Sequence, residues 1–425
     1  MRLVSAPWIV PVVTPPIRDG AVLLGDGAHG DGIDDNTIVA VGRRADLLRL
    51  HGALPETRAE GTLCPGLVNA HAHLELSSLA GAVPGGDGVV AWTRRLAPRL
   101  AARAAESASV DESALRAAHD AQRFGTAALA DVGNGTAGWR AMAQVGLKGT
   151  FFHELVGSRE ARTGDALADA AAERAGAQAA AADRLRDIPA VPAPHAPYSV
   201  GPDLMRRIFA AAAAAGRATT IHLAEDGDEI DLLRAGAGAW PAVLEALGVP
   251  PGERVPRLGP AAYLESLGAF AAPPPPLLVH MVHADADDRR RARAAGATVV
   301  LCPRSNLHIG GRLPDVPALI ADGLRLAMGT DSLASVPDLS LWAEMATLAI
   351  HFPQVAPRAW LAAATMGGAA ALGLARLGSL APGQRPGLLD VIAYGGGGSH
   401  DGGDEDPERA LLRHPSPTLR WMASP

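Results

Sequence analysis

Short apolar runs alternate with longer, alanine-rich segments along most of the chain. The runs have the length and composition of buried strands, and the segments between them have helical spacing. They predict eight strands, over residues 63–70, 126–131, 149–154, 190–193, 218–222, 277–280, 298–302 and 326–329. Helices are predicted between them, among others over residues 111–124, 164–186, 202–215 and 286–295. This alternation indicates an α/β fold, a (β/α)8 TIM-like barrel.

Both ends of the chain have a different pattern. Short β-rich runs separated by Gly/Asp turns occupy residues 8–13, 21–24 and 37–42, and another occupies 388–394. We therefore expect residues 1–62 and 378–425 to build one small β-sandwich from both termini, and residues 63–377 to form the barrel. A long excursion after the fifth strand predicts three more helices, over residues 228–236, 240–247 and 260–267.

Composition narrows the kind of protein. The net charge of −7 argues against a nucleic-acid partner. No apolar run approaches the roughly 20 residues of a membrane span. Two cysteines suit a reducing compartment, and prolines interrupt the apolar start as they would not in a signal peptide. We expect a cytoplasmic protein with a small-molecule substrate, and the sequence leaves a homodimer open.

Metal-ligating residue types lie at the predicted strand ends, where barrels carry their catalytic groups. His71 and His73 follow the first strand and share one face of it. His222 ends the fifth strand, and Asp331 follows the eighth. Three imidazoles and one carboxylate suit a single metal ion with an open position for water. An isolated H-x-H is more often a pair of polar turn residues, so the metal hypothesis depends on the whole set.

Proton carriers lie beside these ligands in the sequence. Glu225 lies three residues after His222, and Asp331 can both bind the metal and accept a proton. His280 ends the sixth strand and is the favoured histidine for polarising the attacked group, with His283 as the competing candidate. A bound metal would lower the pKa of its water towards neutrality and so supply hydroxide.

Taken together, these motifs resemble the amidohydrolase superfamily. The matching stretches are Pro65–His73, His222-x-x-Glu225, His280, Gly329–Ser332 and the C-terminal run 382–390. The resemblance covers nearly the whole chain and includes the split β-sandwich. It implies that the metal ligands are His71, His73, His222 and Asp331, and that the catalytic residues are Glu225, His280 and Asp331.

The position of the only lysine in the chain bears on the number of metal ions. Two-metal branches of this superfamily bridge their ions with a carboxylated lysine on the fourth strand. Lys148 is the only lysine of this chain and precedes the third predicted strand. We therefore expect one divalent ion, Zn²⁺, with Fe²⁺ as the alternative.

The mononuclear branch of deaminases and chlorohydrolases is the most similar part of that superfamily. Residues 71–77, 301–307 and 329–335 resemble the aminodeoxyfutalosine deaminases of menaquinone synthesis. This implies hydrolytic deamination of an aminopurine nucleoside, 6-amino-6-deoxyfutalosine, by metal-bound hydroxide. It also implies substrate-binding roles for His195, Arg304 and Asn306.

A futalosine-type substrate carries a benzoate, which a guanidinium binds well. Arg159, Arg162 and Arg304 are the candidates, although in so arginine-biased a chain each is equally well a solvated surface residue. Alternative substrates are S-adenosylhomocysteine, methylthioadenosine, adenosine, guanine and chlorinated triazines. A metal-free, non-catalytic relative is the alternative from a different class.

Overall fold

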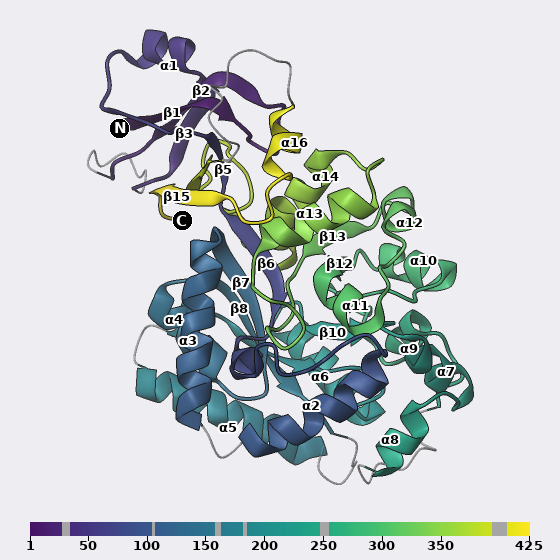
Figure 1. Cartoon of the computed structure of the whole chain (residues 1–425). Coiled ribbons are helices and arrows are strands. Elements are labelled where there is room, and N and C mark those ends of the chain that lie inside the picture. The colour runs from purple at the N-terminus through teal and green to yellow at the C-terminus, as the bar shows by residue number, and fades with distance from the viewer. Residues whose placement is uncertain (28–34, 104–106, 158–162, 182–184, 247–254, 393–405) are drawn as a thin grey trace. The chain divides into compact units, whose positions relative to one another are not determined.

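The computed structural model describes residues 1–27, 35–103, 107–157, 163–181, 185–246, 255–392 and 406–425 (Figure 1). Contacts divide the chain into two compact units. The first comprises Met1–Asn69, Ala121–Ala128 and Ser340–Pro425, and the second comprises Ala70–Asp120 and Leu129–Leu339. The domain boundaries expected after residues 62 and 377 stay a prediction.

In the first unit, strands from both ends of the chain join one seven-stranded sheet. Its order is β15-β14-β5-β1-β2-β3, with β4 paired to β1. The strands are β1 (Arg2–Ile9), β2 (Ile17–Leu24), β3 (Ile38–Arg43), β4 (Glu56–Arg58), β5 (Thr62–Pro65), β14 (Leu388–Ile392) and β15 (Thr418–Ala423). Buried Val4, Ile9, Leu63 and Leu388 pack together on it. Both termini thus share a sheet, and its closure as a sandwich stays a prediction.

The helices of the first unit are short, apart from one. They are α1 (Arg44–His51), α13 (Leu341–His351), α14 (Pro357–Ala362), the π-helical turn η5 (Ala363–Gly367), α15 (Gly368–Ala371) and α16 (Pro407–Leu411). The predicted loop over 395–407 lies largely outside the described residues.

Eight strands form two four-stranded sheets, ordered β6-β7-β8-β9 and β10-β11-β12-β13. They are β6 (Leu67–Ala72), β7 (Thr126–Gly133), β8 (Lys148–Leu155), β9 (Ala190–Pro194), β10 (Thr220–Leu223), β11 (Leu277–His280), β12 (Thr298–Leu301) and β13 (Arg325–Met328). Neighbours in the second sheet are parallel, as are β8 and β9. Each of the eight predicted strands is therefore found, because a fully buried strand reads as an unbroken apolar run.

The first predicted strand needs a correction, because residues 63–70 belong to two strands in different sheets. β5 ends at Pro65, and β6 begins at Leu67. Gly66 between them is closely packed: a Cβ there would lie 2.7 Å from the Ala127 Cβ and from the Pro386 carbonyl oxygen. An apolar run does not reveal such a break, since both strands are buried.

The two four-stranded sheets approach each other at both edges through the backbone. The His222 N–H donates to the His195 carbonyl oxygen at 2.9 Å. At the other edge Ala72 forms a bridge with Asp331, and the N–H groups of Thr330 and Asp331 donate to the His71 carbonyl oxygen. Among the described residues these contacts do not extend into ladders, so the hydrogen bonds do not make one closed sheet.

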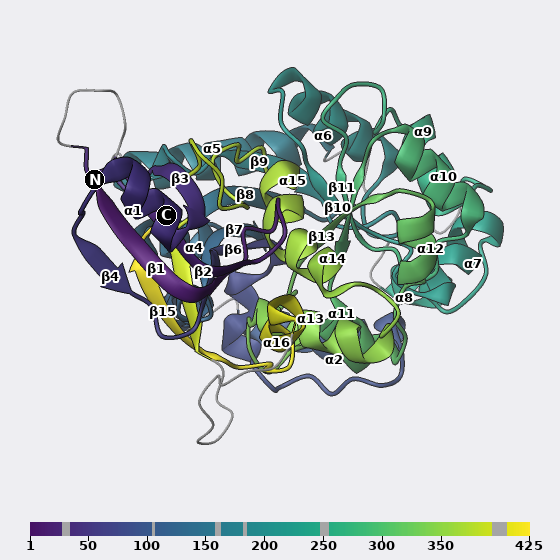
Figure 2. The same ribbon diagram turned by 90° about the horizontal axis from the view of Figure 1, so that it is seen from above.

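Helices lie around the strands of the second unit, as Figure 2 shows for α6, α9, α10 and α12. They are η1 (Leu74–Leu79), α2 (Val89–Arg103), α3 (Ser107–Arg123), α4 (Ala137–Val145), α5 (Thr163–Ala181), α6 (Pro202–Ala214), α7 (Gly227–Ala235), α8 (Trp240–Ala246), α9 (Pro260–Ser266), α10 (Ala286–Ala294), α11 (Pro303–Gly310) and α12 (Val316–Ala321). Local signals explain their starts: Asp285 and Asp288 form a capping box before α10, and proline opens α6.

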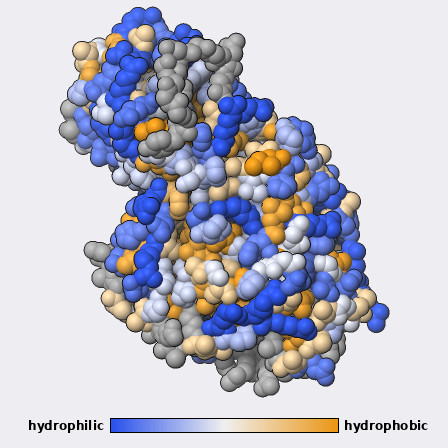
Figure 3. Space-filling view, viewed as in Figure 1, coloured by the Kyte–Doolittle hydropathy of each residue, from blue (hydrophilic) through white to orange (hydrophobic). Residues whose placement is uncertain are grey.

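Hydrophilic and hydrophobic residues are interspersed on the face shown in Figure 3. Among the described residues, no helix has the length and apolar character needed to span a bilayer.

Candidate active site

Four of the five proposed metal-binding and polarising side chains come from strand ends that meet in the second unit. His71 lies in β6 with His73 just after it, His222 lies in β10, and His280 is the last residue of β11. Asp331 follows β13 by three residues. Ligand atoms of His71, His73 and Asp331 lie within 4.8 Å of one another, and so do those of His71, His222 and His280. All of these side chains are buried.

The imidazoles are oriented for a shared cation. The Nε2 atoms of His71 and His73 lie 3.1 Å apart, and Nε2 of His73 lies 3.6 Å from Oδ1 of Asp331. Nδ1 of His222 contacts the His195 carbonyl oxygen at 2.8 Å, which leaves Nε2 as its free ligand atom. A backbone carbonyl that takes the second ring N–H is the usual support of a metal-bound histidine.

Electrostatics also fit a metal ion. Burial, followed by neighbouring imidazoles, lowers the pKa of His71 and His222 well below the usual range, so both rings are neutral and their lone pairs are available. Oδ2 of Asp331 accepts a hydrogen bond from the Ser305 hydroxyl, which holds the carboxylate in place. Three imidazoles with one carboxylate match the donor set of a mononuclear site.

Backbone conformation at the strand ends is unusual. His280, Met281 and Asp331 have φ values of 78°, 53° and 65°, and Ala224 before Glu225 has 52°. Non-glycine residues rarely adopt positive φ, and such strain persists where the surrounding structure imposes it, often at functional sites. Here it aims side chains from the ends of short strands towards a common point.

Glu225 lies beside His280 in a buried environment. Its Oε1 lies 3.6 Å from Nε2 of His280, and its side chain is 9% exposed. The N–H groups of Ala224 and Glu225 donate to the carboxylate of Glu229, which fixes this turn. Burial first, and then the carboxylates of Asp331, Asp226 and Glu229, raises the pKa of Glu225 well above its usual range. The raised pKa favours the protonated form of Glu225.

The geometry favours His280 over His283 as the histidine that polarises the attacked group. His280 is 1% exposed, and the amide of Asn306 contacts its Nδ1 at 2.9 Å. With Nδ1 engaged by a donor, Nε2 carries the proton and faces Glu225. His283 is partly exposed and lines a different cavity together with Arg312.

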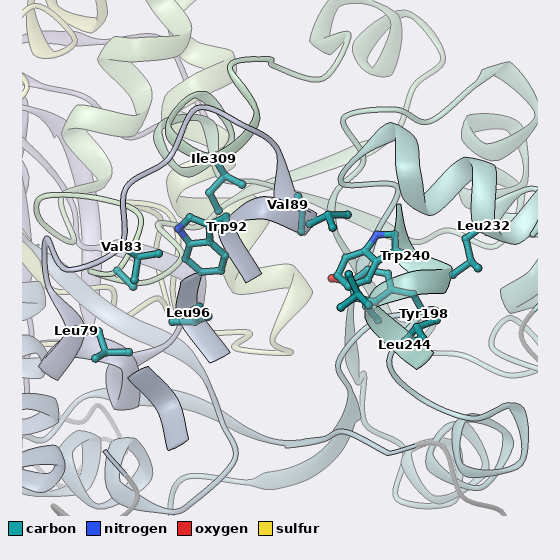
Figure 4. Close-up of a cluster of buried hydrophobic side chains, with 14 residues drawn as sticks. Leu79, Val83, Val89, Trp92, Leu96, Tyr198, Leu232, Trp240, Leu244 and Ile309 are labelled. Atoms are coloured by element: carbon teal, nitrogen blue, oxygen red, sulfur yellow. The ribbon is translucent and has the colours of Figure 1, made fainter. Parts of the chain in front are cut away.

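A cavity of about 430 Å³ opens above these groups. His73, His222, Glu225, His280 and Asp331 are among its polar lining residues. Apolar and aromatic residues line it as well, and in Figure 4 Trp92 and Leu96 of α2 lie on one side of the group, with Tyr198, Trp240 and Leu244 on the other. The rings of Tyr198 and Trp240 are stacked with centroids 3.9 Å apart. The cavity thus offers both polar and apolar contacts to a small molecule.

The predicted substrate-binding residues have different positions. His195 lines the cavity, with Nδ1 held by the Ser199 hydroxyl. Asn306 contacts His280 and is not among the residues that line this cavity. Through this contact it acts on the substrate only indirectly, by way of His280. The Arg304 guanidinium donates to Asp338 and is not among the residues that line the cavity, which argues against a substrate contact. Arg159 and Arg162 lie outside the described residues.

Sequence reasoning gave no role to several residues that line the cavity. Glu154 follows His153 at the end of β8, a position of the kind that drew attention to the histidines. Trp92 and Trp240 line it as well. Glu75 lines it too and accepts a hydrogen bond from the Gly135 N–H. For the tryptophans, no local sequence signal distinguishes a side chain that lines a cavity from one that packs between a helix and a strand.

Sequence comparison gives a family and named relatives. Residues 62–391 match the model of the amidohydrolase family. The aminodeoxyfutalosine deaminase of Deinococcus radiodurans is 32% identical over 354 residues, which are 79% of this chain and 79% of that protein. A 5-methylthioadenosine/S-adenosylhomocysteine deaminase of Desulforudis audaxviator is 28% identical over 409 residues, which are 92% of this chain and 84% of that protein.

Structure comparison agrees on the fold. The Helicobacter pylori aminofutalosine deaminase in complex with methylthio-coformycin superposes with a TM-score of 0.83, at 20% identity, over 100% of this chain and 99% of that one. The architecture is therefore an α/β fold of the TIM-barrel type.

Proposed function

Because the chain belongs to the amidohydrolase family and is a hydrolase that acts on carbon–nitrogen bonds, we propose that it deaminates 6-amino-6-deoxyfutalosine with one divalent metal ion. Deamination of aminopurine nucleosides is the broader activity that its relatives share. The two four-stranded sheets are taken as halves of one closed (β/α)8 barrel. The convergence of buried His71, His73, His222 and Asp331 carries the proposal.

These four residues would hold the ion. Their donor set is that of Zn²⁺, which we propose in preference to Fe²⁺. Such an ion lowers the pKa of a bound water and makes a hydroxide nucleophile available at neutral pH. Lys148 is the first residue of β8, at the opposite end from the site and not on the fourth strand, β9, so the bridging lysine of a two-metal site is missing from its place.

The chain's own residues divide the proton transfers. Glu225, whose raised pKa favours the protonated form, donates to the ring nitrogen next to the carbon that bears the amine, which makes that carbon electrophilic. Asp331 accepts one proton from the attacking oxygen and delivers it to the departing amine, which leaves as ammonia, and the second proton of the water restores Glu225. His280, oriented by Asn306, donates from Nε2 and holds the attacking oxygen.

The benzoate of aminodeoxyfutalosine needs a cationic partner. None of the described residues that line the cavity is an arginine or a lysine. Val156 and Gly157 line it, and Arg159 and Arg162 follow Gly157 in the chain by two and five residues. We propose that these two arginines bind the carboxylate of the substrate. The proposal depends only on their closeness in the sequence to these cavity-lining residues.

A second candidate is deamination of 5′-methylthioadenosine. The apolar and aromatic part of the cavity lining, which includes Trp92, Leu96, Tyr198 and Trp240, suits an uncharged thioether as well as it suits an aromatic ring. The relative from Desulforudis audaxviator bears that activity in its name.

An ammonia-release assay of the zinc-loaded protein tests the proposal. The substrates are aminodeoxyfutalosine, methylthioadenosine, S-adenosylhomocysteine, adenosine, guanine and a chlorinated triazine, the last followed by chloride release. We expect the highest kcat/KM for aminodeoxyfutalosine and a selective rise of its KM in Arg159→Ala or Arg162→Ala. Faster turnover of methylthioadenosine would replace the first candidate by the second. Release from none of the nucleosides would refute both.

A further inference from the structure

Asp131 is a buried acidic residue of β7 that the proposed proton transfers do not use. It lies near the end of that strand and has no exposed surface. Its Oδ1 accepts a hydrogen bond from the N–H of Leu74 at 2.9 Å, across 57 positions of the chain. Leu74 is the first residue of η1 and directly follows the proposed metal ligand His73. Asp131 therefore holds the backbone at the point where a proposed ligand leaves its strand.

This hydrogen bond restrains the backbone of His73 itself. The N–H of Leu74 belongs to the peptide group that joins the two residues, and because a peptide group is planar, fixing the N–H restrains the ψ angle of His73. That residue has a φ of −122° and a ψ of 83°, outside the regular helix and strand regions. The first N–H groups of a helix have no acceptor within it, and no side chain at His73 caps η1. Asp131 supplies the acceptor that the turn lacks locally.

A second hydrogen bond attaches η1 to the same part of the second unit. The N–H of Gly135, which lies between β7 and α4, donates to Oε2 of Glu75 at 2.9 Å. Glu75 is the second residue of η1, so both contacts act within two residues of His73. One donor comes from each segment. The turn after the two histidines is therefore attached to the end of β7 and to the connection that follows it.

The other oxygen of Asp131 is closely packed against α4. Gly138 is the second residue of this nine-residue helix, and a Cβ there would lie 1.9 Å from Oδ2 and 2.9 Å from Oδ1 of Asp131. Only glycine allows the helix to approach the carboxyl group so closely. Among the described residues no donor reaches Oδ2, but the N-terminal end of a helix favours negative charge nearby. Asp131 is thus held between η1 on one side and α4 on the other.

We propose that Asp131 is a positioning residue of the metal site: it orients His73 through the peptide group of Leu74, and its removal lowers metal affinity beyond what the loss of stability explains. This inference rests on the proposed one-metal site, in which His73 is a ligand, and adds a supporting residue to it. Groups that orient a metal ligand typically contribute about 10- to 100-fold to metal affinity. Here the supporting group binds the backbone beside the ligand and not its ring.

Zinc affinity of the full chain, measured by competition with a chelator, tests the proposal. We expect Asp131→Ala to lower this affinity by roughly 10- to 100-fold. Asp131→Asn keeps an oxygen that can accept from the Leu74 N–H, so it should recover most of the loss. Protein loaded with Co²⁺ gives a second readout, because the visible absorption of the bound ion depends on the arrangement of its ligands. The spectrum should change in Asp131→Ala and stay close to wild type in Asp131→Asn.

Asp288→Ala is the matched control. Asp288 is also buried, and its Oδ1 accepts from the N–H of Ala261 at 2.9 Å, a backbone group of another element. It caps α10 and joins it to α9, outside the cavity lining and outside the groups of candidate metal ligands. Both alanine variants should lower the Tm of the metal-free protein by a few degrees. Only Asp131→Ala should lower zinc affinity.

Gly138→Ala displaces the carboxyl group of Asp131 without removing it, and it serves if Asp131→Ala does not fold. The three atoms nearest to the new Cβ all belong to Asp131. The substitution should therefore lower zinc affinity in the wild-type background. In the Asp131→Ala background the Cβ meets no carboxyl group, so the same substitution should have little further effect. Such non-additivity is the signature of two residues that act through one contact.

The outcomes separate this inference from the proposed function. Equal zinc affinity and an equal Co²⁺ spectrum in wild type and Asp131→Ala would overturn the positioning role. An equal loss of affinity in Asp131→Ala and Asp288→Ala would also overturn it, because Asp131 would then support only the fold. An asparagine variant as weak as the alanine variant would overturn the role of the hydrogen bond. A wild type that binds neither ion and releases no ammonia from any nucleoside would instead refute the proposed function.

Discussion

Substituting Gly329 by alanine should disturb a proposed metal ligand directly. Gly329 follows β13, and its N–H donates to the Leu301 carbonyl oxygen. A Cβ at this position would lie 2.8 Å from the His71 Cβ, 2.9 Å from the His71 carbonyl oxygen and 3.0 Å from the Cys302 sulfur. Two of these contacts involve backbone or Cβ atoms, which a change of side-chain rotamer cannot relieve.

The size of the effect follows from these distances. Carbon atoms in contact prefer a separation of about 3.5–4.0 Å, so His71 and residue 329 must move apart by about 1 Å. Overpacking of this kind costs about 1–3 kcal/mol of the free energy of unfolding. A displacement of about 1 Å at a catalytic constellation lowers activity by on the order of 10²-fold. We therefore expect weaker metal binding, a Tm lowered by a few degrees and a large loss of kcat.

Zinc content by mass spectrometry, thermal unfolding and steady-state ammonia release measure the three effects. Gly176→Ala is the matched control, because Gly176 lies within α5 and a Cβ there meets no atom within 4 Å. It should leave activity unchanged and raise stability by about 0.5–1 kcal/mol, the helix preference of alanine over glycine. If Gly329→Ala retained stoichiometric zinc and wild-type kcat, the close approach of residue 329 to His71 would not matter for metal binding or activity, and this prediction would be wrong.

Further predictions concern the groups around the proposed ion. Glu225→Gln should lower kcat by roughly 10²- to 10⁴-fold with zinc still bound, and a zinc-loaded variant of near-normal kcat would remove Glu225 from the mechanism. Asn306→Leu should lower kcat more than it raises KM, because it frees Nδ1 of His280; an effect on KM alone would favour the predicted substrate contact. Ser305→Ala should weaken zinc affinity by roughly 10- to 100-fold through loss of the hydrogen bond to Asp331, as competition with a chelator would measure. Complete chelation should abolish activity and lower Tm, with recovery of both on adding Zn²⁺, and unchanged turnover after chelation would contradict the metal site.

Much of this protein follows from local sequence. Each barrel strand is a buried apolar run, and turn residues or alanine-rich segments bound it, so strand positions and the α/β order were predictable. The strand-end rule then singled out His71, His73, His222, His280 and Asp331 before any distance was known, because parallel strands carry their functional groups at one end.

Other features depend on contacts between residues distant in the chain, which no local pattern records. The strand-end position favours His280 over His283, and only the folded structure adds its burial and its contact with Asn306, 26 residues away in the chain. Positive φ at His280 and Asp331 is imposed by the surrounding packing and not by the residue types.

The sequence by itself determined the order of strands and helices and the chemistry available at the strand ends. Only the tertiary structure decided which of those groups face one another, and that Trp92 and Trp240 line a cavity. It also decided that Oε1 of Glu154 is left without a donor among the described residues. The physical reason is that hydrophobic periodicity is a property of neighbouring residues, whereas burial, hydrogen-bond satisfaction and cavity shape arise from segments that meet only after folding.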